Sequence, residues 1–209
     1  MPKMEPFEKY TSKYENWFKQ NKYAFESELR AIEDQMVARG KGIEIGVGSG
    51  QFAAPLGIHL GIDPSKQMLK LAKQRGIDVL EGIAEKLPFS KAKFDFLLMV
   101  TTICFLDDID RAFNEAYRIL KLTGFILIGF IDKDSHLGFL YQQRKNQSLF
   151  YKIATFYSVE EVLLHLKKAG FKDFHFTQTI FRNLPEIRKT EPIKKGYREG
   201  AFVVIRASK

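Results

Sequence analysis

Three glycines and one carboxylate in the first third of the chain are the residues best suited to bind a ligand. Gly46, Gly48 and Gly50 alternate directly after the apolar run 42–45, and Asp63 ends the next apolar run. Glycine accepts positive φ angles and lets the backbone approach a ligand closely, because it has no Cβ. A carboxylate at the tip of the neighbouring strand can accept hydrogen bonds from two ribose hydroxyls. The pattern predicts a nucleoside-binding crevice between two parallel strands.

The residues after the glycines exclude two common phosphate-binding sites. A P-loop requires Lys-Ser/Thr after its last glycine, whereas Gln51 and Phe52 follow Gly50 here. A dinucleotide fingerprint requires glycine or alanine at the position of Gln51 and an acid about 20 residues beyond the glycines. Asp63 comes too early for that pattern. A nucleoside ligand without a pyrophosphate remains, and S-adenosylmethionine fits that description.

The order and spacing of several short motifs resemble the class I S-adenosylmethionine-dependent methyltransferases that act on small molecules, including the ubiquinone/menaquinone biosynthesis group. The motifs are Glu44-x-Gly46-x-Gly48-x-Gly50, Asp63-Pro64-Ser65-x-x-Met68-Leu69, Gly82-x-Ala84-Glu85-x-Leu87-Pro88-Phe89, the run 94–100, Glu115-x-x-Arg118-Ile119-Leu120-Lys121 and a strand from Gly124. The resemblance implies an α/β fold, a Rossmann-like open sandwich with helices on both faces. Its seven-stranded, mostly parallel sheet has the order 3-2-1-4-5-7-6, with an antiparallel last strand.

The resemblance also assigns roles in binding the cofactor, which leaves as S-adenosylhomocysteine. It implies backbone contacts to the methionyl part at the glycine turn, an ammonium contact at Glu44 and a ribose contact at Asp63. The predicted cofactor contacts are Glu44, Gly46, Gly48, Gly50, Asp63, Met68, Ala84, Glu85 and Thr101. Two alternatives stay open: Asp63 as a helix cap, and Glu85 as a solvated loop acid. Many relatives carry aspartate at the position of Ile83, and isoleucine cannot bind the adenine amino group.

Methyl transfer from a sulfonium is an in-line displacement, so protein catalysis consists mostly of orientation and exclusion of water. The four histidines show no ligand spacing, and we predict no metal site. His136, with Asp132 near it in sequence, is the candidate general base, and an exposed loop histidine is the alternative. The run Thr101-Thr102-Ile103-Cys104 lacks the Asn/Asp-Pro-Pro-Tyr/Phe motif of amide and adenine methyltransferases. This absence favours a small-molecule acceptor.

Alternating strand and helix patterns indicate βαβ units and a parallel sheet that would position these residues. The expected elements are strand 42–45, helix 51–57, a strand ending at 63, helix 65–75, strand 94–100, helix 108–121, strand 124–131, a helix begun by the capping box at Ser158 and Glu161, and strands 171–181 and 201–207. We expect one domain with four parts: a helical lid (1–40), a cofactor-binding core (41–131), an irregular substrate-side insert (132–157) and a C-terminal helix with an antiparallel strand pair (158–209). The candidate lid residues are Tyr10, Tyr14 and Trp17, with simple packing as the alternative.

Composition constrains location and partners. The 209 residues contain 33 Lys and Arg against 25 Asp and Glu, which gives a net charge of +8. Cys104 is the only cysteine, and no signal-peptide or membrane-spanning pattern occurs, so we predict a cytoplasmic protein without a membrane partner. The basic residues of the last 28 positions motivate a second hypothesis, a nucleic-acid methyltransferase, and a catalytically inactive cofactor-binding regulator is a third. The acceptor and the oligomeric state stay open.

Overall fold

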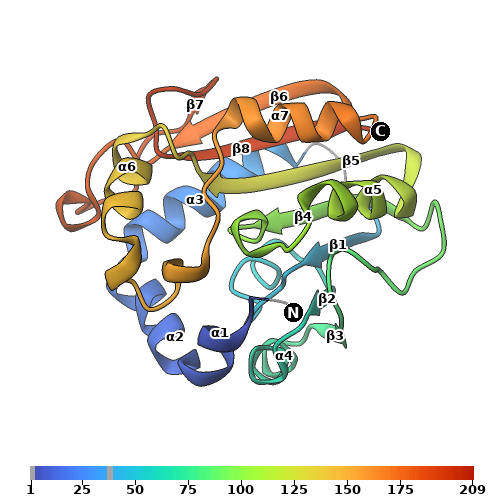
Figure 1. Ribbon diagram of the computed structural model, residues 1–209, viewed down its shortest axis with the longest axis horizontal. Coiled ribbons are helices and arrows are strands. Elements are labelled where there is room, and N and C mark those ends of the chain that lie inside the picture. The colour runs from blue at the N-terminus through green and yellow to red at the C-terminus, as the bar shows by residue number, and fades with distance from the viewer. Residues whose placement is uncertain (1–2, 37–39) are drawn as a thin grey trace.

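One eight-stranded sheet organises the computed structural model, which describes residues 3–36 and 40–209 (Figure 1). Residues 1–2 and 37–39 of the expected lid lie outside the described residues. The strands are β1 (Gly42–Ile45), β2 (Leu60–Asp63), β3 (Asp78–Glu81), β4 (Phe94–Val100), β5 (Leu120–Ile131), β6 (Lys172–Thr179), β7 (Lys194–Lys195) and β8 (Phe202–Ser208). Their order is β3-β2-β1-β4-β5-β8-β6-β7. The expected fold class is confirmed, but the sheet has eight strands instead of seven, because the two-residue β7 adds a strand at the edge; without it the order is the expected one.

The sheet is parallel from β3 to β5, and β8 runs antiparallel to both β5 and β6. Strand β4 is nearly all apolar because helices cover both of its faces. Leu97 and Met99 belong to one buried cluster, and Leu98 and Val100 to the other. Successive side chains of a strand point to opposite faces, so this alternation divides the hydrophobic core into two layers.

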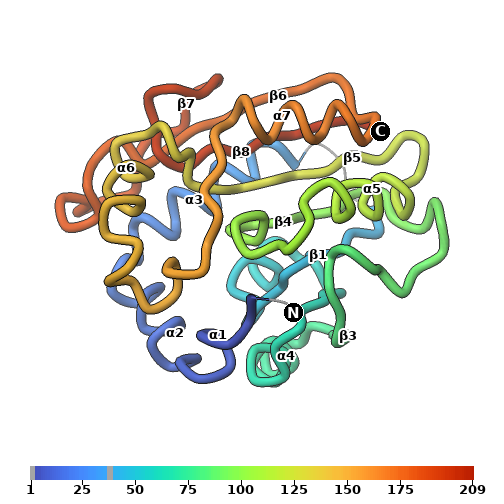
Figure 2. Tube along the Cα trace, in the orientation of Figure 1, coloured from blue at the N-terminus to red at the C-terminus, as the bar shows by residue number. Residues whose placement is uncertain are grey.

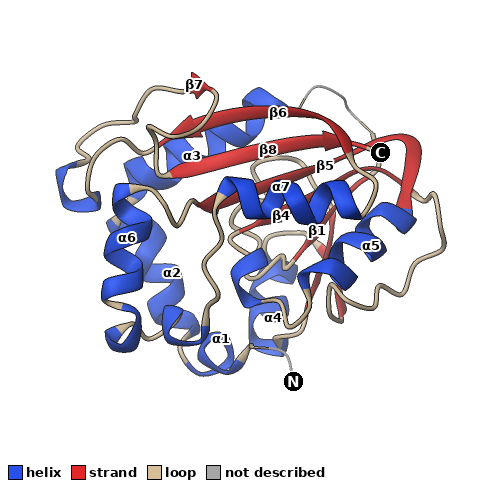
Figure 3. Cartoon of the chain, turned by 45° about the horizontal axis from the view of Figure 1, so that its top comes forward, coloured by secondary structure: helices blue, strands red, loops and turns tan. Residues whose placement is uncertain are grey.

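Helices cover the two faces in separate groups. The α-helices are α1 (Glu5–Lys9), α2 (Thr11–Gln20), α3 (Lys22–Gln35), α4 (Lys66–Gln74), α5 (Ile109–Ile119), α6 (His136–Gln143) and α7 (Val159–Lys168). Helices α5 and α7 contribute to one core layer, whereas α3 and α4 contribute to the other. Figure 3 shows α5 and α7 in front of the strands and α3 behind them.

Three expected elements differ from the structure. Residues 51–57 form consecutive turns instead of a helix, because Pro55 has no N–H to donate and Gly57 takes a positive φ of 67°. Strand β5 starts at Leu120, directly after α5, and its register shifts between the pairs Phe94/Leu120 and Phe96/Phe125. The insert is more regular than expected, because Ser135 caps α6 by accepting a hydrogen bond from Gly138 N at 3.0 Å.

The predicted capping box at the start of α7 is confirmed. Ser158 Oγ accepts from Glu161 N at 3.2 Å, and Glu161 Oε2 accepts from Ser158 N at 2.8 Å. We expect Ser158→Ala to lower the free energy of unfolding by about 1 kcal/mol, because the variant leaves a helical N–H without its acceptor. Urea denaturation measures this difference. The exposed Ser90→Ala serves as the control, and equal losses in both variants would contradict the capping role.

Candidate active site

A cavity of about 280 Å³ opens at the carboxyl ends of the parallel strands. Its floor is formed by the turn after β1, the tip of β2 and the end of β4, and its roof by the N-terminal helices and the insert. Figure 1 shows α1, α2 and α6 gathered at this end of the sheet. Ligands of open α/β sheets bind outside the carboxyl ends of the strands, at the point where the strand order reverses. The cavity lies at that point, beside β1 and its two neighbours.

The glycine turn brings backbone close to the cavity. Gly46 and Gly48 line it with positive φ angles of 72° and 52°. A Cβ on Gly46 would lie 2.4 Å from the side chain of Thr102, and one on Gly48 would lie 3.4 Å from the Tyr14 hydroxyl. Any larger residue would therefore strain the turn or fill the space below Tyr14. Gly50 does not line the cavity, and a Cβ on it would lie 2.4 Å from the side chain of Ile77.

Asp63 lies at the tip of β2, where it lines the cavity at 9% exposure. Its Oδ2 accepts from Gly48 N at 2.9 Å and its Oδ1 from Ser65 N at 2.8 Å. Helix α4 is capped by Ser65, whose Oγ accepts from Met68 N. Burial raises the pKa of Asp63 to about 6, although the two backbone N–H groups lower it. Each carboxylate oxygen accepts one backbone bond and keeps capacity for a second donor.

Glu44 lies inside the sheet, on β1, and does not line the cavity. Its side chain is 1% exposed, and its Oε2 has no hydrogen-bond partner among the described residues. Burial raises its pKa well above the ordinary value, although a hydrogen bond from the backbone of Ala53 opposes this rise. Contact between Glu44 and a ligand therefore needs a bridging group.

The other predicted cofactor contacts also lie at the cavity. Met68, Ala84, Glu85 and Thr101 all line the cavity. The Glu85 carboxylate accepts hydrogen bonds from the N–H groups of Asp107 (2.9 Å) and Asp108 (3.3 Å). It therefore fixes the loop that leads into α5, and it is not a freely solvated loop acid.

Thr101 directly follows β4 and has a left-handed conformation, with φ 49°. Its N–H donates to Gly129 O at 2.7 Å, which continues the pairing with β5 for one residue beyond the strand. A β-branched residue at positive φ costs free energy and persists only where its surroundings enforce it. The bend turns the chain so that both Thr101 and Thr102 face the cavity.

The roof joins two distant parts of the chain through aromatic rings. Phe7 contacts Phe105 and Phe150, with ring centroids 4.9 Å and 5.2 Å apart, and Tyr14 also contacts Phe150. Figure 2 shows the N-terminal segment and the insert at the same end of the molecule. Tyr14 and Trp17 line the cavity, whereas Tyr10 is 37% exposed and does not.

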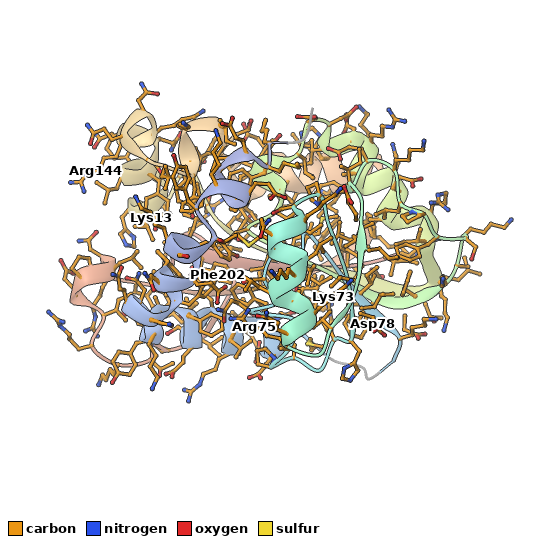
Figure 4. The ribbon with its side chains drawn as sticks, turned by 90° about the horizontal axis from the view of Figure 1, so that it is seen from below. Lys13, Lys73, Arg75, Asp78, Arg144 and Phe202 are labelled. Atoms are coloured by element: carbon orange, nitrogen blue, oxygen red, sulfur yellow. The ribbon has the colours of Figure 1, made fainter. Side chains whose placement is uncertain are left out.

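Polar contacts connect helix α2 of the roof to the end of α4 and to the glycine turn. Arg75, labelled in Figure 4 at the end of α4, pairs with Glu15 of α2 and donates to Ser49 O at 2.8 Å. Gln51 donates to the same Glu15 carboxylate at 3.0 Å. Three segments, namely α2, α4 and the glycine turn, are thereby held together.

Known proteins share the sequence and the fold of this chain. Residues 43–128 match the family described as methyltransferase domain. The chain is 48% identical to a Thermotoga maritima crystal structure described as a SAM-dependent methyltransferase and possible histamine N-methyltransferase, with a TM-score of 0.96 and 99% of both chains covered. The chain belongs to the class I S-adenosylmethionine-dependent methyltransferases.

Two further relatives extend this comparison. An uncharacterised protein of Methanocaldococcus jannaschii is 45% identical over 99% of this chain and 100% of its own length. A ubiquinone/menaquinone biosynthesis C-methyltransferase of Rickettsia felis is 29% identical, over 64% of this chain and 69% of its own. The sequence-based family assignment is therefore confirmed.

The methyltransferase does not bring its predicted general base to the cavity. His136 is exposed at the first turn of α6 and does not line the cavity. Asp132 is 4% exposed and also lies outside the lining, where its Oδ1 accepts from Asp134 N at 3.2 Å. The structure thus offers no contact for either residue with a ligand in this cavity.

Glu28 is a residue of the methyltransferase cavity that sequence reasoning missed, whereas Tyr141 and Tyr151, which also line it, were placed only generally in the substrate-side insert. Glu28 is 5% exposed on α3, between the buried Ala24 and Ala31. An acid at helical spacing from Ala24 and Ala31 is the signal that could have identified it. The two tyrosines belong to the insert, whose side chains cannot be placed from periodicity.

Residues 3–36 and 40–209 contain no group of three or more His, Cys, Asp or Glu side chains placed to hold a metal ion. Within the same ranges, every helix is too short or too polar to span a lipid bilayer.

Proposed function

We propose that this methyltransferase transfers the methyl group of S-adenosylmethionine to a small molecule bound in the aromatic part of the cavity. The observation that carries the proposal is one continuous cavity with two chemically different regions. The turn after β1 and Asp63 offer backbone and a carboxylate, whereas Tyr14, Trp17 and Tyr151 offer aromatic surface. Donor and acceptor can therefore meet in one enclosed space, as an in-line displacement requires.

The residues present fit the donor. Asp63 has acceptor capacity for two ribose hydroxyls, and the space above Gly48 is closed only by the Tyr14 hydroxyl. The unpartnered oxygen of Glu44 would attract the amino group of the methionyl part through a bridging water. Bound S-adenosylmethionine supplies a methyl group already activated by its sulfonium. The chain then has to orient the two reactants and exclude water, which the roof does.

The size and covering of the cavity favour a small acceptor over a nucleic acid. Pockets for small ligands commonly enclose about 300–1,000 Å³. The cavity of about 280 Å³ is close to the lower limit of that range, and aromatic rings cover part of it. The names of two relatives, one a possible histamine N-methyltransferase and one a quinone-pathway C-methyltransferase, also refer to small acceptors. We propose a small-molecule acceptor for this chain, but we do not assign it the specific acceptor of either relative.

The basic C-terminal residues are partly neutralised within the chain. Three of them pair with carboxylates: Arg182 with Glu191, Lys194 with Glu199 and Arg198 with Glu160. Lys209 Nζ donates to the carbonyl oxygens of Tyr117 and Leu120. These contacts weaken the case for a phosphate-binding face.

The test has two steps. Calorimetry with S-adenosylhomocysteine is expected to show one binding site, and a panel of amines, phenols, thiols and quinone precursors is then screened for S-adenosylhomocysteine release. Salt-dependent RNA retention together with RNA methylation would instead support the nucleic-acid hypothesis. Cofactor binding without turnover on any acceptor would support the inactive regulator. The cytoplasmic location stays a prediction.

A further inference from the structure

The only acidic side chain from α3 that lines the cavity within the described residues is Glu28. Its side chain is 5% exposed, although α3 packs with its apolar face against the sheet. Burial alone raises the pKa of Glu28 to about 8, and no hydrogen-bond donor or cation among the described residues opposes the shift. A buried carboxyl group without a partner costs free energy, so its presence in a ligand cavity indicates a partner supplied by the ligand.

The residues around Glu28 indicate the chemical class of that ligand. The hydroxyl groups of Tyr14, Tyr141 and Tyr151 lie near enough for the charge of Glu28 to raise their pKa values, although burial is the first cause in each case. All three tyrosines line the cavity with Trp17. Aromatic faces attract cations electrostatically, and one carboxylate among them provides a counter-ion.

The other charged groups of the cavity face elsewhere. Lys3 donates to Leu106 O and Thr155 Oγ1, and Lys13 lies over the ring of Tyr10. Neither lysine lowers the pKa of Glu28. The remaining acids of the lining are Asp63, Glu85 and Asp107, and all three belong to the wall built from the strand ends. Glu28 therefore acts on the acceptor side of the cavity.

We infer that the acceptor is an amine with a compact apolar body, and that Glu28 binds its nitrogen and takes its proton. This inference rests on the proposed function and names the substrate class of the same site. An ammonium group would pair with the Glu28 carboxylate, while its apolar body would pack against the rings of the roof. A phenol or thiol offers no cation for this arrangement.

The step balances without another reactant. An ammonium nitrogen has no free electron pair, so one proton must leave before attack. The Glu28 carboxylate accepts that proton, and the nitrogen forms a bond to the methyl carbon as the carbon–sulfur bond breaks. The bonding pair goes to sulfur, which loses its positive charge as the nitrogen gains one. A base whose pKa lies near the operating pH suits this transfer.

Binding measurements separate this inference from the proposed function. The protein is saturated with S-adenosylhomocysteine and titrated with a panel of aliphatic and arylalkyl amines, each paired with the alcohol of the same skeleton. At least one amine is expected to bind wild type about 30-fold or more tightly than its alcohol. Glu28→Gln is expected to abolish that preference, Glu28→Asp to restore part of it, and the exposed Glu33→Gln on the same helix to retain it.

Proton release provides a second readout. At pH 7 the free Glu28 is mostly protonated, and so is an alkylamine, whereas their complex keeps only one of the two protons. Calorimetry in buffers of different ionisation enthalpy should show nearly one proton released by wild type and none by Glu28→Gln. The wild-type kcat/KM on the amine should rise with pH through about 8, and the variant should lose that inflection.

The outcomes are distinct. Failure of wild type to bind S-adenosylhomocysteine would overturn the proposed function itself. Binding of the cofactor, with no amine bound more tightly than its alcohol, would overturn the assignment of Glu28 alone. Equal methylation of a phenol or thiol by wild type and Glu28→Gln would do the same. Unchanged cofactor affinity in Glu28→Gln is the control that the variant remains folded.

Discussion

Replacing Asp63 by alanine is expected to weaken the binding of S-adenosylmethionine by about two to three orders of magnitude. Each carboxylate oxygen already accepts one backbone N–H, from Gly48 or from Ser65, and keeps capacity for a second donor in a side chain that lines the cavity. Hydrogen bonds to a charged group contribute about 1.5–3 kcal/mol each, so losing two accounts for a change of this size. Isothermal calorimetry with S-adenosylhomocysteine measures it directly.

The matched control removes a carboxylate that lies away from the cavity. Asp78→Ala, exposed at the start of the neighbouring β3, removes a carboxylate from the opposite end of the same parallel pair. It should bind the cofactor like wild type. Affinity should also fall in wild type as pH decreases through about 6, because protonation removes acceptor capacity from Asp63. Retention of wild-type affinity by Asp63→Ala would exclude the ribose role.

The second large effect concerns stability. Glu28 has a pKa of about 8 in the folded protein, against an ordinary value of 4.5. Between these values the folded state holds a proton that the unfolded state has released, so the contribution of Glu28 to stability is full below pH 4.5 and is lost as pH rises towards 8. Relative to Glu28→Gln, wild type should therefore lose about 3 kcal/mol of unfolding free energy between pH 5 and pH 8.

Urea denaturation of both proteins across this pH range tests the expectation. Glutamine has nearly the same shape and cannot ionise, so the difference between the two curves isolates the carboxyl group. Glu33→Gln should show no such pH dependence, because Glu33 is exposed. Parallel curves for wild type and Glu28→Gln would show that Glu28 titrates at an ordinary pKa, with no cost of burial. Ionisable groups held at a cost to stability are characteristic of functional sites.

Much of the fold could be predicted because its signals are local. The apolar run of β4 predicted a strand buried on both faces, and the structure has the same limits, Phe94–Val100. Glycines beside a strand end and an acid at the next strand tip predicted the crevice, and parallel pairing then brings Gly48 and Asp63 within 2.9 Å. The same reasoning failed at 51–57, where Pro55 interrupts the helical hydrogen bonds.

The acceptor side could not be predicted, because it depends on which segments meet in space. His136 was chosen for its position after β5, but capping of α6 by Ser135 leaves that side chain in solvent. Glu28 lies far from the glycine turn in sequence and reaches the cavity only because α3 packs across the sheet. No spacing rule relates it to Tyr141 or Tyr151. The ribose role of Asp63 stays a prediction that the Asp63→Ala measurement addresses, and the lid role of Tyr14 stays a prediction.

The two margins of the roof differ in the forces that hold them. Salt screens the partly buried Arg75–Glu15 ion pair only in part, whereas sulfate and similar salts strengthen contacts between apolar rings such as Phe7 and Phe150. Added ammonium sulfate should therefore weaken the ion pair beside the donor and strengthen the ring contacts beside the acceptor. Exchange of the two ligands would then respond to ionic strength in opposite directions.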